Sequence, residues 1–289
     1  MSDDLFYMPA SEALRAFQHK TLSPVEYVKA VIDRCEAVNP KLNAFTYTFF
    51  DKAVDAAKAA EKRYASGDAR PLEGLPLAIK DTHPVAGEIS TSGSRLLKDN
   101  RANHTSPATQ RLLDAGAIMH ARTTSPEFAH AGYCYSALWG VTRNPWNVDY
   151  APGGSSGGAA AALASGMTAL ADGSDGGGSI RIPASASGVV GYKPPFGRNP
   201  HTLLPTAFER LIMLGPLGRT VEDVRRMQNV MAGPHMDDIT SIYPKLEIPP
   251  PESIKGWKIA YSPDLGYVEV DEEVRKNTEA CVEAFRSMG

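Results

Sequence analysis

A glycine-rich loop that runs into a serine is the stretch whose residue types could do chemistry most directly. Gly176, Gly177 and Gly178 are followed by Ser179. Because glycine has no Cβ atom, such a loop can turn several backbone N–H groups toward one point and bind an anion. If Ser179 begins a helix, the dipole of that helix strengthens the anion site. The pattern is therefore that of a hydroxyl nucleophile beside an oxyanion hole.

Two other interpretations of this loop have to be weighed. Glycine-rich loops before helices are also common as plain turns or as phosphate cradles. A cradle of the Walker type needs Gly-Lys-Ser/Thr after the glycines, and Ser179-Ile180-Arg181 does not supply it. Taken alone, the stretch leaves a catalytic loop and a structural turn open.

A lysine stands at the end of a predicted strand upstream. Residues 75–79, Leu-Pro-Leu-Ala-Ile, form a short apolar run that ends in Lys80 and Asp81. Such a run indicates a buried strand, and open α/β sheets place their sites at the carboxyl ends of their strands. Lys80 would then face the site. The alternative is a lysine that extends its amine into solvent, and this segment alone favours that interpretation.

A second serine loop, Pro-Gly-Gly-Ser-Ser-Gly-Gly at residues 152–158, matches the nucleophile elbow of α/β-hydrolases with Ser155 at its centre. That elbow requires a buried strand directly before its first glycine, whereas residues 144–152 have a loop-like composition. Only His201 and His235 lie downstream of it, each beside a proline. The α/β-hydrolase interpretation is therefore disfavoured.

The elements that must position these loops alternate along the chain. Ser23, Pro24 and Glu26 form a capping box with proline at the first helical position, so a helix is expected from there to Asn39-Pro40. Apolar runs at residues 117–119, 167–171 and 189–192 indicate strands between further helices. The alternation predicts an α/β fold, a mostly parallel mixed sheet covered by helices on both faces, with an N-terminal helical segment.

Composition excludes several classes of function. The 289-residue chain has a formal net charge of −3 and no long basic or acidic run, which argues against nucleic acid and against an anionic membrane as partners. It has no apolar segment of membrane-spanning length and no signal peptide at its start. Its three cysteines lack the spacing of a metal site. We expect a soluble, cytoplasmic protein.

The combination of two serine loops with an upstream Lys-Asp pair is more specific than any of its parts. The sequence resembles the amidase signature family over nearly the whole chain, with motifs in the family's order. They are Leu-Ser-Pro-Val-Glu at 22–26, Gly-Leu-Pro-Leu-Ala-Ile-Lys-Asp at 74–81, Pro-Gly-Gly-Ser-Ser-Gly-Gly at 152–158, Gly-Ser-Asp-Gly-Gly-Gly-Ser-Ile-Arg-Ile-Pro at 173–183 and Gly-Pro-Leu-Gly-Arg-Thr at 215–220. The resemblance implies the amidase signature fold.

The resemblance also implies a Ser-Ser-Lys catalytic set. Ser179 would be the nucleophile, and Lys80 would be the general base in its neutral form. Ser155, whose preceding peptide bond is cis in the family, would bridge the two and relay the proton. The oxyanion would bind to backbone N–H groups of the loop, those of Gly176, Gly177, Gly178 and Ser179.

Three further residues match family positions as supports of the site rather than chemical participants. They are Asp175, Arg181 and Ser156. The implied reaction cleaves a carboxamide into a carboxylate and ammonia or an amine through an acyl-enzyme, without a metal or an organic cofactor. The expected partner is a small-molecule amide, and a homodimer is the oligomeric state considered. Two alternatives stay open, an amidotransferase A-type subunit that releases ammonia for a partner protein and a truncated, non-catalytic member.

We expect a single domain over residues 1–289. It would comprise an N-terminal helical part (1–70), a catalytic core (71–233), a linker with three consecutive prolines (234–256) and the start of a C-terminal part that looks truncated (257–289). In that last part, residues 257–261 predict a strand and residues 271–285 a helix.

Overall fold

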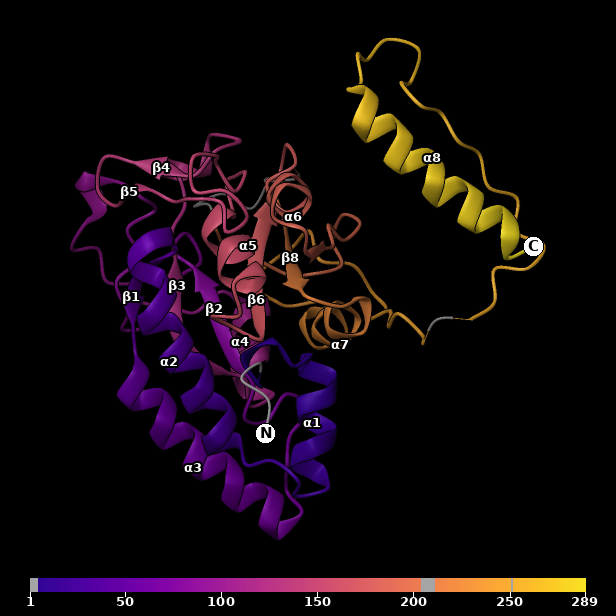
Figure 1. Ribbon diagram of the computed structural model, residues 1–289. Coiled ribbons are helices and arrows are strands. Elements are labelled where there is room, and N and C mark those ends of the chain that lie inside the picture. Colours follow the sequence, from indigo (N-terminus) through magenta and orange to yellow (C-terminus); the bar gives the residue numbers. More distant parts are fainter. Residues whose placement is uncertain (1–4, 204–210, 251) are drawn as a thin grey trace. The chain divides into compact units, whose positions relative to one another are not determined.

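Figure 1 shows the protein as a computed structural model, which describes residues 5–203, 211–250 and 252–289. Three short parts of the predicted domain therefore lie outside the described residues, namely 1–4, 204–210 and 251. The chain divides into two compact units, Met1–Ile248 and Pro249–Gly289. Each unit is described by itself.

A six-stranded mixed sheet lies at the centre of the first unit. Its strand order is β1-β3-β2-β6-β8-β7. Parallel pairing joins β2 to β3 and to β6, whereas the β1–β3, β6–β8 and β7–β8 pairs are antiparallel. The strands are β1 (Phe45–Thr48), β2 (Pro76–Lys80), β3 (Ile118–Thr123), β6 (Leu170–Asp175), β7 (Val190–Gly191) and β8 (Met213–Gly218). A separate two-stranded sheet pairs β4 (Tyr135–Ser136) with β5 (Gly140–Val141).

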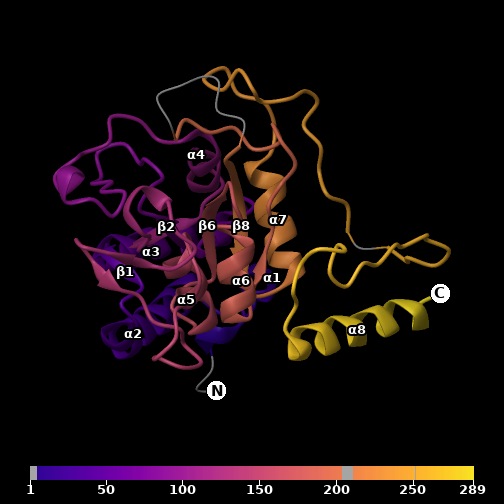
Figure 2. The same ribbon diagram turned by 90° about the horizontal axis from the view of Figure 1, so that it is seen from above.

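Helices cover both faces of this mixed sheet, so the predicted α/β fold is confirmed. The sheet is not mostly parallel as predicted, because three of its five strand pairs are antiparallel. Figure 2 shows α4 on one side of the central strands and α5 on the other. The α-helices of the first unit are α1 (Ala10–Gln18), α2 (Pro24–Leu42), α3 (Phe50–Ser66), α4 (Pro107–Asp114), α5 (Gly157–Ala164), α6 (Arg181–Ser187) and α7 (Val221–Met231). Short 3-10 helices span Leu5–Tyr7, Arg95–Leu97 and Glu127–Ala129. Parallel pairing is limited to the centre of the sheet, at β3, β2 and β6, where a helix-containing crossover precedes each new strand.

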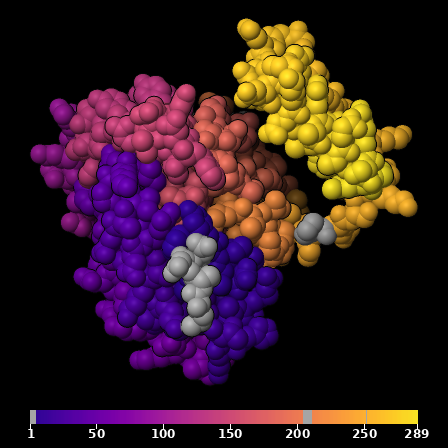
Figure 3. Space-filling model, in the orientation of Figure 1, coloured from indigo at the N-terminus to yellow at the C-terminus, as the bar shows by residue number. Residues whose placement is uncertain are grey.

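The predicted N-terminal helical segment is present as α1, α2 and α3, which form a continuous indigo and purple surface in Figure 3. Ser23 caps α2, and Glu26 closes the expected capping box. The predicted end at Asn39-Pro40 is wrong, because the helix continues to Leu42. A proline in the last turn removes one hydrogen bond, but here Asn43 still donates its amide to the carbonyl of Asn39 and closes that turn.

Helix α5 lies directly against the sheet because its residues are small. All of its residues except Ala164 are buried. A Cβ atom at Gly158 would come within 2.6 Å of the carbonyl oxygen of Ala44 and of the amide nitrogen of Thr124. Only glycine permits this approach, which brings the segment before the helix next to the ends of β2 and β6.

The second unit contains one helix, α8 (Glu272–Ser287), within its described residues. It confirms the helix predicted at residues 271–285, and the Asp271 side chain caps it by accepting the amide of Glu273. The strand predicted at residues 257–261 does not form, because no described segment pairs with it. Apolar side chains of this unit, Trp257 and Tyr267 among them, are exposed.

Candidate active site

The predicted site residues come from three places that the fold brings together. Lys80 is the last residue of β2, and Asp175 is the last residue of the neighbouring strand β6. Ser179 lies in the loop between β6 and α6, whereas Ser155 and Ser156 directly precede α5. Helix α6 begins at Arg181, so Ser179 belongs to the loop itself.

Lys80 is fully buried, and its amine lies among three hydroxyl groups. The Nζ atom is 2.7 Å from Ser155 Oγ, 2.9 Å from Ser156 Oγ and 3.1 Å from Ser174 Oγ. The interpretation in which this lysine extends into solvent is therefore wrong. Burial disfavours the charged amine and lowers the pKa of Lys80 to about 7, although the nearby carboxylates of Asp172 and Asp175 act in the opposite direction.

Ser155 is held by tight backbone packing. The peptide bond between Gly154 and Ser155 is cis. A Cβ atom at Gly154 would lie 2.5 Å from the carbonyl oxygen of Tyr133, so this position requires glycine. No elbow strand precedes it, since residues 142–153 contain no strand. The geometry thus differs from the nucleophile elbow.

The loop that carries Ser179 lies against the second serine loop. The amide of Ser156 donates to the carbonyl oxygen of Ser179 at 3.1 Å. The Ser179 side chain is partly exposed, and its hydroxyl forms no hydrogen bond with any residue that the structure describes. Ser179 is therefore next to the buried Ser155-Lys80 pair through the backbone.

The carboxylate of Asp175 organises the same loop. It accepts the amides of Gly178 at 2.8 Å, Ile180 at 3.2 Å and Arg181 at 3.3 Å, and it binds two guanidinium nitrogens of Arg181, each at 2.9 Å. Burial alone would raise the pKa of Asp175, but these hydrogen bonds, led by those of Arg181, outweigh it and lower the pKa to about 2. Asp175 is thus an anion at neutral pH.

This arrangement decides which amides of the loop remain free. The amide of Gly178 is directed at Asp175, so it does not fit the role expected of it in the oxyanion hole. The amides of Gly176, Gly177 and Ser179 form no hydrogen bond with described residues. These three are the donors that could bind a developing negative charge.

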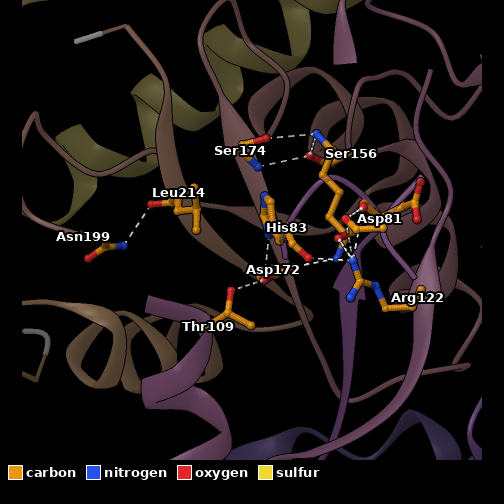
Figure 4. A network of polar contacts seen from close by, with 11 residues as sticks. Asp81, His83, Thr109, Arg122, Ser156, Asp172, Ser174, Asn199 and Leu214 are labelled. Atoms are coloured by element: carbon orange, nitrogen blue, oxygen red, sulfur yellow. Dashed lines mark hydrogen bonds and ion pairs between the residues drawn. The ribbon is translucent and has the colours of Figure 1, made fainter. Parts of the chain in front are cut away.

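Sequence reasoning missed a polar cluster on the other side of Lys80, which Figure 4 shows from close by. Asp172 accepts the backbone amide of Lys80 at 2.7 Å on one oxygen. Its other oxygen lies 2.8 Å from His83 Nδ1 and accepts the Thr109 hydroxyl at 3.2 Å. Arg122, also buried, donates to the carbonyl oxygens of Lys80, Asp81 and His83.

One signal in the sequence could have found part of this cluster. Side chains alternate along a strand, so Asp172 and Ser174 point to the same side of β6. Both contact Lys80, one at its backbone and one at its amine. His83 and Arg122 carry no such signal, because their contacts depend on how β2, β3 and β6 lie in the sheet.

The described part of the chain shows neither a membrane-spanning helix nor a metal site. None of its helices is both long enough and apolar enough to cross a bilayer. Within the described residues, no group of three or more His, Cys, Asp or Glu side chains could hold a metal ion.

Comparison with known proteins gives concordant matches. The model of the family described as Amidase matches residues 26–289. An acylamidase of Rhodococcus erythropolis is 39% identical, over 99% of this chain and 61% of that protein. The A-type subunit of the glutamyl-tRNA(Gln) amidotransferase of Carboxydothermus hydrogenoformans is 36% identical, over 99% of this chain and 60% of that protein.

A solved structure agrees with these matches. The crystal structure of a bacterial aryl acylamidase of the amidase signature enzymes family has a TM-score of 0.91 to this chain at 34% identity. That match covers 98% of this chain and 60% of the other. The chain therefore spans about three fifths of the length of the relatives that it matches.

Proposed function

Since the chain belongs to the amidase signature family, we propose that it hydrolyses a small carboxamide through an acyl-enzyme on Ser179. The observation that carries the proposal is the buried contact of 2.7 Å between Lys80 Nζ and Ser155 Oγ, beside the loop of Ser179. The products would be a carboxylate and either ammonia or an amine.

Lys80 serves as the base in this proposal because its surroundings favour the neutral amine. A neutral amine has two N–H donors and one lone pair. Its two N–H groups are matched by the hydroxyl oxygens of Ser156 and Ser174, at 2.9 and 3.1 Å. The lone pair then faces Ser155, whose oxygen is the nearest of the three. Ser156 and Ser174 thus orient the base.

Ser155 passes the proton between Lys80 and the nucleophile. Its hydroxyl donates to the lone pair of Lys80, and its oxygen can accept the proton of Ser179 once that hydroxyl turns inward. The hydrogen bond between Ser156 and Ser179 keeps the two loops next to each other. As Ser179 Oγ attacks the carbonyl carbon, its proton moves to Ser155, and the proton of Ser155 moves to Lys80.

The negative charge of the tetrahedral intermediate would be bound by the loop amides. We assign this role to Gly176, Gly177 and Ser179, because the amide of Gly178 already binds Asp175. Asp175 and Arg181 support the reaction indirectly by fixing the loop. The loss of one oxyanion donor typically slows acyl transfer about 100-fold or more.

Collapse of the intermediate breaks the carbon–nitrogen bond and leaves an ester on Ser179. The proton held by Lys80 returns through Ser155 to the leaving nitrogen, so ammonia or an amine departs neutral. Water then attacks the ester with the same relay acting as base, and the carboxylate is released. The chain's own residues supply every proton transfer in this sequence.

A second candidate is an amidotransferase A-type subunit that makes ammonia for a partner protein. The support for it is the 36% identity to the subunit from Carboxydothermus hydrogenoformans, close to the 39% identity to the acylamidase. The two candidates differ in substrate. Release of ammonia from glutamine only in the presence of a second protein would favour the amidotransferase.

A fluorophosphonate probe tests the nucleophile without knowledge of the substrate. We expect one adduct on the intact protein by mass spectrometry, none on Ser179→Ala, and labelling slowed about 100-fold or more on Lys80→Ala. A folded wild-type chain that forms no adduct would contradict the hydrolase proposal and leave a non-catalytic role.

A panel of amides then identifies the substrate class. The names of the relatives justify including acylated aromatic amines beside simple carboxamides and glutamine. Hydrolysis by the wild-type chain, and not by Ser179→Ala, would assign the substrate to this site. Hydrolysis that survives in Ser179→Ala would assign it elsewhere.

A further inference from the structure

A buried carboxylate links the backbone of Lys80 to a histidine. Asp172 binds the Lys80 amide with Oδ1, and Oδ2 meets His83 Nδ1 (Figure 4). All three side chains are fully buried. The β2 and β6 strands pair at Leu77 with Leu170 and at Ala78 with Ala171. Beyond these pairs, the hydrogen bond from the Lys80 amide to the Asp172 carboxylate joins the two strands.

Besides Asp172, two groups near the Lys80 amine could carry a negative charge, Cys134 and Asp175. Cys134 is one of them, but burial raises the pKa of its thiol, which therefore stays neutral. Asp175 is an anion, but the guanidinium of Arg181 binds it at 2.9 Å. Neither group leaves an unbalanced negative charge beside the amine.

Two further charged groups lie behind the lysine, on the segment after β2 and on β3. The Asp81 carboxylate accepts the amides of Thr91 and Gly93 and the Thr91 hydroxyl. Arg122 is the cation of the cluster and points at backbone carbonyl oxygens. The guanidinium of Arg122 also interacts with the charge of Asp172.

His83 does not neutralise Asp172. Burial lowers the pKa of His83 below its usual value, although Asp172 acts in the opposite direction. Burial would raise the pKa of Asp172, but the contacts with His83 and with the Lys80 amide, together with the charge of Arg122, outweigh it. The pair is therefore an anionic carboxylate bound to a neutral imidazole that donates from Nδ1.

We propose that Asp172 is a positioning residue for Lys80, which fixes the lysine backbone through one carboxylate oxygen and acts on the amine through its negative charge. His83 holds the other oxygen and, being neutral, leaves that charge in place. The inference rests on the proposed role of Lys80 as the base. Asp172 would stabilise the protonated amine that forms each time Lys80 takes a proton, and so oppose the effect of burial.

The direct test is the titration of Lys80 in Asp172→Asn. The asparagine keeps the shape and can still accept the Lys80 amide, while its own amide group can donate to His83 in the other tautomer. With ¹³C-labelled lysine, the Cε signal of Lys80 is identified by its loss in Lys80→Met. We expect the midpoint of its titration in Asp172→Asn to lie about one pH unit below that of wild type. An unchanged midpoint in the folded variant overturns the proposal.

Thr109→Val is the matched control. It removes the hydrogen bond of 3.2 Å to Asp172 Oδ2 without changing any charge. The Lys80 midpoint should stay at the wild-type value. A decrease in Thr109→Val as large as that in Asp172→Asn would assign the effect to local packing and overturn the role of the charge.

A measurement on the wild-type chain keeps the proposal testable even if Asp172→Asn does not fold. The ¹⁵N signals of His83 report its protonation state, and we expect a neutral ring with the proton on Nδ1 at pH 7. A positively charged His83 would cancel the charge of Asp172 and overturn the proposal.

Probe labelling separates this inference from the proposed function. If the wild type forms no adduct while the Lys80 midpoint shifts in Asp172→Asn, the hydrolase proposal fails and the action of Asp172 on Lys80 stands. If the wild type is labelled and the midpoint does not shift, only the role of Asp172 fails. When both hold, the acid limb of the labelling rate in Asp172→Asn should move to lower pH with the midpoint.

Discussion

The side-chain nitrogen of Lys80 lies 2.7 Å from the hydroxyl oxygen of Ser155, and neither side chain is exposed to solvent. The sheet delivers the lysine from the end of β2, and the loop before α5 delivers the serine. A base in such a place is useful only while it is neutral, so the behaviour of the site with pH follows from this contact.

The rate of probe labelling should therefore follow the protonation of Lys80. Burial lowers the pKa of the lysine to about 7. Below that pH the amine is charged and cannot accept a proton, so the rate should fall about tenfold per pH unit, and above it the rate should level off. Labelling rates between pH 5 and pH 9, on a protein shown by circular dichroism to stay folded, would check this. A rate that is still rising about tenfold per pH unit between pH 8 and pH 9 would contradict it.

The same burial makes stability depend on pH. The pKa of Lys80 is about 7 in the folded chain, against about 10.4 for an unperturbed lysine. Between these values the unfolded chain binds one proton more, so the free energy of unfolding rises with pH by about 1.4 kcal/mol per unit from this residue. Lys80→Met removes the dependence. In urea unfolding, wild type should therefore become more stable relative to Lys80→Met by about 2–3 kcal/mol when the pH is raised from 7 to 9.

If the stability difference between wild type and Lys80→Met is the same at pH 7 and at pH 9, Lys80 is not neutral in the folded protein. Thr109→Val serves as a control for this experiment, because it alters a buried contact near the site without removing a titratable group. Its stability difference from wild type should be the same at both pH values.

Local sequence was sufficient to predict the elements that present the chemistry. The apolar run before Lys80 forms β2, and the capping box at Ser23 begins α2. In both cases the signal lies within a few neighbouring residues. The strand expected at residues 257–261 failed because a strand also needs a partner, and partners depend on the rest of the fold.

The surroundings of Lys80 could be predicted only in part. The alternation of side chains places Asp172 and Ser174 on one side of β6. Nothing local indicates that His83 meets Asp172, 89 residues further along the chain, or that Arg122 binds the carbonyl oxygen of Lys80. Those contacts follow from the order of β3, β2 and β6 in the sheet, which local patterns do not specify.

Asp175 and Arg181 form an ion pair, but we expect the loss of Asp175 to destabilise the protein more than the loss of Arg181. Arg181 is 55% exposed, so its loss in Arg181→Ala should lower the free energy of unfolding by less than about 1 kcal/mol. Asp175 is buried and also accepts three backbone amides. Asp175→Asn turns one acceptor into a donor that faces these groups, and it should cost about 2–3 kcal/mol. Urea unfolding of both variants at pH 7 compares the two costs.

The pH dependence of the Asp175 contribution has a definite sign. The pKa of this carboxyl is lowered to about 2 in the folded chain, so its contribution is present above about pH 4 and is lost as the pH falls toward 2. The stability difference between wild type and Asp175→Asn should narrow over that window. A larger cost for Arg181→Ala than for Asp175→Asn would show that the guanidinium, and not the amides, holds the loop.

Replacement by alanine should lower the stability of the protein at one of two neighbouring glycines in the Ser179 loop and not at the other. Gly178 has a φ of +115°, and an added Cβ would lie 2.7 Å from the Cδ1 atom of Ile182. This backbone directs its amide to Asp175, so Gly178→Ala should cost about 1–3 kcal/mol. Gly177 has no such φ, and nothing lies within 4 Å of its added Cβ. Gly177→Ala should therefore stay within about 0.5 kcal/mol of wild type. Equal stabilities of the two variants, from urea unfolding, would mean that the loop does not hold Ser179 in the conformation described.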